Sequence, residues 1–304
     1  MQVKENIFPK RAVAESRSAI TVVSAFATGK GVTIGIDLPC RVTAEIIPRA
    51  EYYSKILVKS AVQDPHRLIE RCVDNSLKAL RVEANSDELI LISVDSEIPS
   101  AAGLKSSSAL SVAVVKAIFG LFSRSTVKSS EEILRISCRS SIQSGASLTG
   151  AFDDAAAGLL GGLVFSDNTK FRLLRHQSLN TEFGSRVKLF VPSYQKLTSS
   201  LKLSEYHEYK KLAQDALRFA RKGIIVQAML INSMIHSLIH RYSMQPIVSS
   251  IDEGASASGV SGKGPAVAAI CPNSKIAARV EKRWKAENPN CRIVTAVITK
   301  ANMR

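Results

Sequence analysis

Short apolar runs and amphipathic segments alternate along the chain and predict a mixture of strands and helices. Period-two alternation and runs of β-branched residues predict strands at 18–27, 32–38, 42–47, 56–61, 89–95, 163–166, 187–191, 266–270 and 292–299. Apolar residues spaced by three and four predict helices at 66–82, 109–122, 131–142, 155–160, 205–221, 224–242, 246–254 and 276–285. The pattern in the first half of the chain therefore predicts a mixed sheet with helices packed against it.

A turn at Asp167-Asn168 divides this pattern and predicts the entry to a second domain. We place one domain at 1–167 and the other at 168–304, with residues 1–17 as a basic N-terminal extension. The 304 residues are enough to bury one large core or two medium ones.

Composition is typical of a globular protein, with 45% hydrophobic and 22% charged residues. No run of about 18 apolar residues occurs, and residues 1–17 lack an apolar signal core, so we expect neither a membrane span nor a secretion signal. Five scattered cysteines without a Cys-x-x-Cys pair indicate free thiols in a reducing compartment. We therefore expect a cytoplasmic protein.

The formal net charge of +15 raises the alternative of a nucleic-acid-binding protein. The basic residues are spread along the chain without a block of five or more, and the 6% aromatic content offers little for base stacking. A general positive field that attracts anionic small molecules accounts for the same charge. We therefore expect no nucleic-acid partner.

The segment from Pro99 to Ala109 passes from loop to helix and carries three consecutive serines where the first helical turn begins. A helix start has backbone N–H groups without partners and the positive end of the helix dipole, so it attracts anions. A serine-capped helix without a ligand is the alternative. A Walker loop at Gly29-Lys30-Gly31 is excluded, because Ser24 and Gly31 stand where it needs a glycine and a hydroxyl residue.

The string Pro99-x-x-x-Gly103-Leu104-x-Ser106-Ser107-x-Ala109 resembles the ATP-phosphate loop of the GHMP kinases, which include galactokinase, homoserine kinase and mevalonate kinase. The resemblance implies a two-domain α+β fold of mixed sheets with helices packed on them and an active site at the domain junction. It implies Mg²⁺ on Ser107, and ATP phosphates on Pro99, Ala102, Gly103, Leu104, Lys105, Ser106, Ser107 and Ser108.

The segment from Ala27 to Asp37 resembles the N-terminal motif of the same family. The resemblance implies that Lys30 stabilises charge at the reacting centre. A solvated turn lysine is the alternative. The residues that we expect to contact substrate are Thr28, Gly29 and Asp37 in this motif, together with Gly150, Gly262 and Gly264 in later segments.

The segment Gly150-Ala151-Phe152-Asp153-Asp154 resembles the one that supplies the catalytic aspartate in mevalonate-kinase-like members. Asp153 matches when counted from the preceding glycine and Asp154 when counted back from Gly161, so both stay candidates to orient or deprotonate the acceptor hydroxyl. An Asx cap on the following helix is the alternative.

A glycine loop near the C-terminus, Ser258 to Ala266, resembles the third family motif and implies that Gly262 and Gly264 complete the pocket. One departure concerns the metal. Mevalonate-kinase-like members carry a magnesium-binding glutamate about a dozen residues before the aspartate, whereas nothing between Glu132 and Asp153 is acidic here, and Gln143 is the nearest polar stand-in for that glutamate.

His236 and His240 lie one helical turn apart and could share a zinc ion. Position 237 is a serine where a zinc protease motif has glutamate, and the surroundings are apolar. We expect core or surface histidines that bind no metal.

Two strings, Ala25 to Asp37 and Gly145 to Asp154, resemble the archaeal shikimate kinases within the GHMP group. The resemblance runs from about Ser18 to Ile270 and implies transfer of phosphate from ATP to shikimate, an anion that we expect an arginine to bind. Arg139 lies nearest the motifs in sequence. Homoserine kinase or another GHMP specificity is the alternative, and a non-catalytic ligand-sensing relative is the alternative of another class. We expect a monomer or a homodimer.

Overall fold

The computed structural model describes residues 10–48, 56–60, 64, 66–83, 87–122, 129–180, 183–194 and 201–302. Its centre is a long antiparallel hairpin of β1 (Arg11–Val23) and β2 (Lys30–Pro48). The sequence predicts two strands where β2 runs without a break, because Pro39 leaves the chain extended. Residues 11–17 belong to β1, so the expectation of a separate extension is wrong for them. Met1 to Pro9 lie outside the described residues.

β2 pairs with different strands along its two halves. Its second half pairs with β4 (Glu88–Ser96), which carries the parallel strand β3 (Ile56–Ser60) on its far edge. Its first half pairs with β5 (Leu163–Asp167), which continues into β6 (Arg172–Gln177). β6 follows the proposed domain boundary yet belongs to this first sheet, so the sheet itself extends to Gln177.

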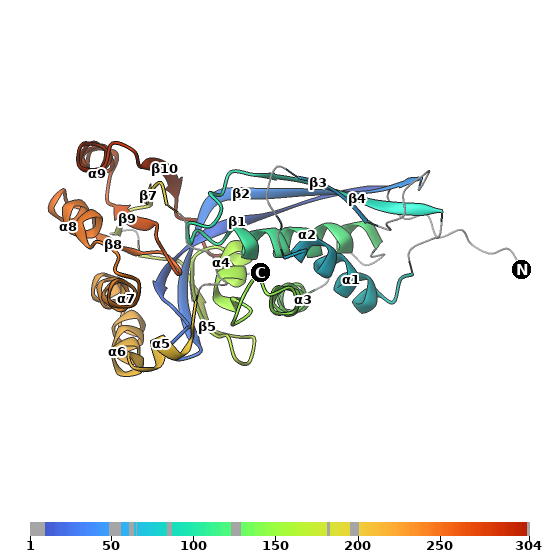
Figure 1. Ribbon diagram of the computed structural model, residues 1–304, viewed down its shortest axis with the longest axis horizontal. Helices are drawn as coiled ribbons and strands as arrows, with labels where there is room; N and C mark the ends of the chain where they lie inside the picture. The colour runs from blue at the N-terminus through green and yellow to red at the C-terminus, as the bar shows by residue number, and fades with distance from the viewer. Residues whose placement is uncertain are drawn as a thin grey trace, which may run out of the picture.

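Helices α1 (Leu68–Leu80), α2 (Ser106–Phe122) and α3 (Ser130–Gln143) lie along one face of the first sheet, and α4 (Phe152–Leu160) packs between α2 and β1 (Figure 1). α2 is apolar almost all round because it contacts the sheet, α1, α3 and α4. This burial fixes the start of α2, which carries the serine triplet.

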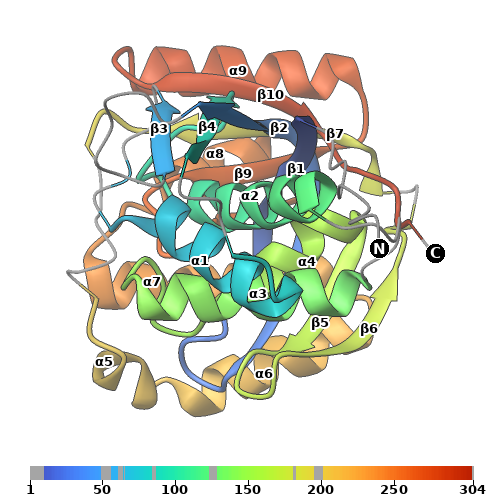
Figure 2. The same ribbon diagram turned by 90° about the vertical axis from the view of Figure 1, so that its right-hand side faces the viewer.

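The second sheet has the order β10-β7-β9-β8, formed by β7 (Arg186–Val191), β8 (Ala257–Val260), β9 (Val267–Cys271) and β10 (Arg292–Val297). The glycine-rich stretch predicted as a loop begins with a strand, β8, which pairs with β9. Gly259 in β8 packs against Met229 and Ser233 so closely that a side chain would not fit. α8 (Gln245–Asp252) and α9 (Ser274–Glu287) pack on this sheet (Figure 2).

Three of the described helices remain. α7 (Ile225–His240) contacts β1 of the first sheet and β8 of the second, α6 (Lys210–Arg221) packs on α7, β1 and β2, and α5 (Ser204–His207) packs on α7. The predicted helix 205–221 is interrupted between α5 and α6. The largest apolar core runs continuously from the first sheet to the second. Gly35 joins the sheets, since its carbonyl accepts a hydrogen bond from the Thr299 N–H at 3.0 Å. The site described next lies at this junction.

Candidate active site

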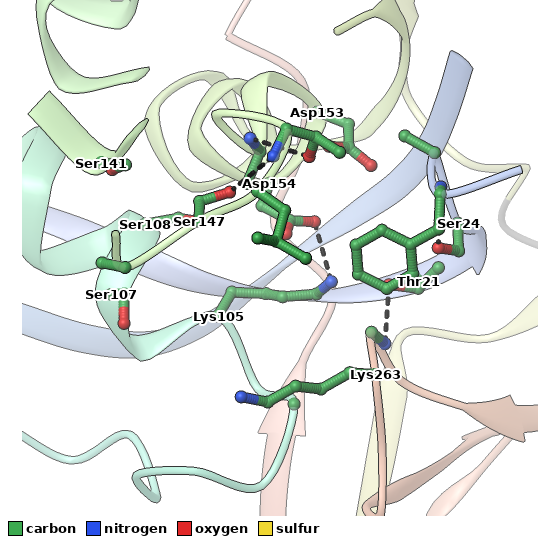
Figure 3. A pocket seen from close by; sticks show the side chains of 18 of the residues that line it. Thr21, Ser24, Lys105, Ser107, Ser108, Ser141, Ser147, Asp153, Asp154 and Lys263 are labelled. Carbon is green, nitrogen blue, oxygen red and sulfur yellow. Dashed lines mark hydrogen bonds and ion pairs between the residues drawn. The ribbon is translucent and has the colours of Figure 1, made fainter. Parts of the chain in front are cut away.

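A cavity lies where β1, the start of α2, the start of α4 and the loop after β8 meet (Figure 3). Its volume is about 130 Å³, below the ~300–1,000 Å³ typical of small-molecule sites, so it suits reacting groups better than a whole nucleotide. It is lined by Thr21, Ser24, Ala25, Phe26, Ala101, Gly103, Lys105, Ser106, Ser107, Ser108, Ser141, Ala146, Ser147, Leu148, Thr149, Ala151, Asp153, Asp154, Asn168, Leu201, Gly262 and Lys263.

The start of α2 presents backbone donors to this cavity. The Ala109 N–H donates to the Lys105 carbonyl at 3.0 Å, so the N–H groups of the three serines precede the first intrahelical bond. These serines, Ser106 to Ser108, all line the cavity. With the positive end of the helix dipole, they form an arrangement that favours a phosphate group.

The glycine loop after β8 is held against the phosphate loop. Gly103 has a φ of +83°, and a side chain there would collide with the Ser261 carbonyl oxygen, 2.3 Å from its Cβ position. The Ser261 hydroxyl donates to the Gly103 carbonyl at 3.0 Å. The Gly262 N–H donates to the Thr21 hydroxyl at 2.9 Å. Two loops separated by some 158 residues thus form one wall of the cavity.

Lys105 occupies a backbone conformation that normally favours glycine, with a φ of +64°. Its ammonium nitrogen lies 2.9 Å from Asp154 Oδ1, and both side chains are almost buried, 8% and 12% exposed. A strained residue of this kind persists only where its surroundings require it, and such residues cluster at functional sites. Lys105 therefore supplies a cation beside the serine N–H groups (Figure 3).

Asp153 is held by a separate set of hydrogen bonds. Its Oδ1 accepts from Asn168 Nδ2 at 2.7 Å and its Oδ2 from the Thr33 hydroxyl at 3.0 Å. Its own N–H donates to Asn168 Oδ1 at 3.1 Å, which locks the amide orientation. Gly31 packs directly on this carboxylate, since a Cβ there would lie 2.1 Å from Asp153 Oδ2. The position of Asp153 is thus fixed by β2 and by the turn after β5.

Burial, and after it the neighbouring charge of Asp153, raise the pKa of Asp154 to about 7. Lys105 and the Thr33 hydroxyl act in the opposite direction. Two adjacent carboxyls therefore have different environments, one held by hydrogen bonds and the other paired with a lysine. A carboxyl whose pKa lies near neutral pH is suited to accept and return a proton.

α4 places both acids in its first turn. Neither acid forms the Asx cap that was the alternative, because α4 begins at Phe152 and its N-cap is Ala151, at a φ of 48° and without a side-chain cap. Gly150 precedes it with a φ of +75°, enclosed by Phe171, Ile142 and Cys138. It does not line the cavity, but its turn directs α4 toward it. The helix dipole favours negative charge at this end.

Lys30 lies on the opposite side of β2 from these acids. Gly31 and Thr33 face Asp153, and side chains alternate along a strand, so Lys30 points to the other face. There it lines a second cavity with Phe165. The structure does not bring Lys30 to the cavity that holds the aspartates.

The other residues of the N-terminal motif act from outside the cavity. The Gly29 carbonyl accepts from the Asn168 N–H at 2.8 Å and so positions the residue that holds Asp153. Thr28 bonds to the backbone of Lys30 at 3.2 Å. Asp37 accepts from the Val297 N–H and joins β2 to β10. None of these three lines the cavity.

Four residues of the phosphate and glycine loops do not line the cavity either, namely Pro99, Ala102, Leu104 and Gly264. The Leu104 carbonyl accepts from the Ser18 hydroxyl at 2.7 Å, and the Ala102 carbonyl accepts from the Ala266 N–H at 3.0 Å. Gly264 packs on the Tyr242 ring. These residues shape the loops that carry the lining groups.

The sequence analysis missed Asn168 and Thr33, which fix Asp153. Asn168 counted as a turn residue, and Thr33 as one position of an alternating strand. Neither residue belongs to a recognisable motif for this role. They become partners of the carboxylate only because α4 approaches β2 and β5 in the fold.

Of the expected metal and substrate ligands, Ser107 lines the cavity. Arg139 is exposed on α3, and no arginine lines the cavity within the described ranges. The same part of the chain contains no group of three or more histidine, cysteine or acidic residues placed to hold a metal ion. The lysines that line the cavity are Lys105 and Lys263.

His236 is buried in the core and His240 is half-buried. The hydroxyl of Tyr206 lies 3.2 Å from His236 Nδ1 and 2.7 Å from His240 Nε2. Burial lowers the pKa of His236 to about 3, so it stays neutral.

Comparison with known proteins defines the class. Residues 67–162 match the GHMP kinases N terminal domain. A homoserine kinase from Cytophaga hutchinsonii superposes with a TM-score of 0.71 at 14% identity, covering 99% of this chain and 98% of that one. A mevalonate kinase of L. major superposes with a TM-score of 0.72 at 14% identity, covering 97% and 99%. The fold is that of the GHMP kinases.

The sequence relatives are more specific. A shikimate kinase of Pyrococcus furiosus is 34% identical over 275 residues, which span 90% of this chain and 96% of the relative. A shikimate kinase of Methanocella arvoryzae is 31% identical over 281 residues, 91% of each chain. The chain belongs to the family of these GHMP-type shikimate kinases.

Proposed function

We propose that the protein transfers the γ-phosphoryl group of ATP to the 3-hydroxyl of shikimate, forming shikimate 3-phosphate and ADP. The observation that carries the mechanism is the buried ion pair of Lys105 and Asp154 beside the N–H groups of Ser106 to Ser108. It combines a cation, a carboxyl and phosphate donors in one cavity, which phosphoryl transfer requires.

Each group has a distinct part in this proposal. The serine N–H groups and Gly262 hold the phosphates. Lys105 neutralises charge on the transferring phosphoryl group and takes the part that the resemblance gave to Lys30. The acceptor oxygen bonds to the γ-phosphorus, the bond to the ADP oxygen breaks, and the hydroxyl proton passes to a carboxylate. Asp154 accepts that proton and Asp153 orients the acceptor.

Mg²⁺ fits this site through hard oxygen ligands, the Ser107 hydroxyl and the phosphate oxygens of ATP. When bound, it would supply charge neutralisation on the phosphates. Residues 10–302 include no described helix long and apolar enough to cross a bilayer. The five cysteines are free thiols, four of them buried, which supports the proposal of a cytoplasmic location.

An assay that couples ADP release to a spectroscopic signal tests the substrate, with shikimate, homoserine and mevalonate as acceptors. We expect turnover with shikimate alone. Turnover with homoserine in its place would reject the substrate and keep the kinase, and ATP binding without turnover on any acceptor would favour a ligand-sensing relative.

Separate Asp153→Asn and Asp154→Asn variants test the assignment of the two acids. Loss of the base costs roughly 10²–10⁴-fold in kcat, so we expect that loss from Asp154→Asn. Asp153→Asn keeps a polar side chain of the same shape and should raise KM for shikimate as well as lower kcat. If Asp153→Asn alone removes turnover, the roles are exchanged.

A further inference from the structure

A second cavity, of about 400 Å³, lies on the face of the first sheet opposite Asp153 and is lined by three cations from three elements. Lys30 comes from β2, Arg175 from β6 and Arg221 from the last turn of α6. Its remaining side chains are mainly apolar, and its full lining is Lys30, Gly31, Phe165, Ser166, Leu174, Arg175, Leu217 and Arg221.

Strand register explains why these groups meet. Val32 pairs with Phe165, which pairs with Arg175, so these three side chains share one face of the sheet. Lys30 lies two residues before Val32 and faces the same way. The Arg175 guanidinium carbon is 5.9 Å from the centre of the Phe165 ring, a cation–π contact.

α6 closes the other side of the cavity. Leu217 is buried, and Arg221 follows it by four residues on the same helix face. α6 packs against β2, so both side chains meet the sheet at the cavity.

The carboxylates near this cavity interact with groups other than its three cations. Asp167 stands opposite Lys30 in the strand register, but its Oδ1 accepts from the Thr169 hydroxyl at 2.6 Å and from two backbone N–H groups of the following turn. Asp215 on α6 pairs with Arg218. Among the described residues, none forms an ion pair with Lys30, Arg175 or Arg221, and no acid lines the cavity.

Three like charges around one cavity repel one another unless an anion lies between them. Arginine forks bind carboxylates and phosphates through paired hydrogen bonds, and the ring of Phe165 with its leucine neighbours offers an apolar floor. We propose that this cavity is a second ligand site that binds a small organic polyanion bearing carboxylate or phosphate groups. The proposal does not depend on the reaction catalysed in the first cavity.

Isothermal titration calorimetry with two probes, citrate and inorganic pyrophosphate, tests this site on the full chain. We expect at least one probe to bind with a Kd below about 1 mM. Because each charged hydrogen bond contributes substantially, the variant Arg175→Gln/Arg221→Gln should bind that probe at least about tenfold more weakly. Preference for citrate or for pyrophosphate distinguishes a polycarboxylate site from a phosphate site.

A matched control removes two other positive charges, one from each of the same two elements. Arg172→Gln/Lys211→Gln alters β6 and α6 but leaves both the cavity lining and the Asp215–Arg218 ion pair intact, so we expect binding within about twofold of the original protein. Lys105→Met disables the first cavity and should leave this binding unchanged. Circular dichroism establishes that each variant is folded.

Three results would overturn the proposal. The first is that neither probe binds at 10 mM, a concentration about ten times the expected Kd. The second is that both double variants weaken binding equally. The third is that Lys105→Met loses binding while Arg175→Gln/Arg221→Gln retains it. The second would show a general charge effect, and the third would assign the probe to the first cavity.

Discussion

The two faces of β2 carry charge in opposite arrangements. On one face Gly31 and Thr33 contact Asp153, and each nearby ionic group has a partner: Asp154 with Lys105, and Asp153 with Asn168 and Thr33. On the other face Lys30 shares a cavity with two arginines and no acid. A single strand thus separates a buried, internally paired site from an open, positively charged one.

This contrast indicates what each face can do. A buried carboxyl next to a lysine can exchange its partner for substrate and transfer a proton, because its environment has already shifted its pKa. The three cations of the other face share their cavity with no carboxyl that could accept a proton, so they are suited to binding alone. The following predictions test the contrast, from the largest expected effect to the smallest.

Lys105→Met should have the largest effect on catalysis. Removing one electrostatic contact to a reacting group typically costs about 10²–10³-fold in kcat. Steady-state kinetics with ATP and shikimate measure it. The double variant Lys105→Met/Asp154→Asn should regain thermal stability, since no buried charge is left unpaired, but not activity. Near-normal kcat in Lys105→Met would remove this lysine from the mechanism.

Gly31→Ala should disturb the site through packing. A methyl group would collide with the carboxylate of Asp153, and overpacking of this kind costs roughly 1–3 kcal/mol. Thermal denaturation and kcat together measure the result. Gly120→Ala is the matched control, because a Cβ added there would meet Ala12 Cβ at 3.3 Å, a contact that a shift of a few tenths of an ångström relieves. Equal effects at both positions would contradict the close approach of β2 to α4.

The pH dependence of stability should differ between the protein and its Asp154→Asn variant. The folded pKa of Asp154, about 7, exceeds its ordinary value of 3.8, so the folded state holds a proton that the unfolded state releases. Stability from this group is therefore present below pH 4 and lost as pH rises to 7, by roughly 1 kcal/mol per pH unit.

Thermal denaturation without ligands at about pH 4.5, 6 and 7.5 checks this prediction, because this range lies mostly between the unfolded and the folded pKa of Asp154. The original protein should lose stability relative to Asp154→Asn as pH rises, because the variant lacks the titrating group. Parallel curves for the two proteins would show that Asp154 is ionised throughout.

Lys30→Met should have the smallest effect on turnover, at most about threefold in kcat, because its side chain lies across the sheet from the aspartates. The same assay as for Lys105→Met measures it. A loss as large as that of Lys105→Met would restore Lys30 as the lysine of the reacting centre, as the resemblance implies, and would require rearrangement of the turn at Gly29.

The sequence predicted most of the elements in their order and the serine helix start, because both depend on local chemistry, but it predicted no strand at β6 or β8. Apolar periodicity specifies which residues must be buried in each element, and three small residues at a helix start leave backbone donors accessible. The glycine loop and the acidic pair were also placed by their motifs. The break between α5 and α6 and the continuity of β2 were not, since packing against neighbouring elements decides them.

By itself, then, the sequence determined that a phosphate loop, an acidic pair and a lysine-bearing turn exist, and the family to which they point. Tertiary structure decided which lysine meets the acids. Side chains alternate across a strand, so a shift of one position moves Lys30 to the far face, whereas the positive φ of Lys105 turns its side chain toward Asp154. Such choices depend on the register between distant strands, which local patterns do not encode.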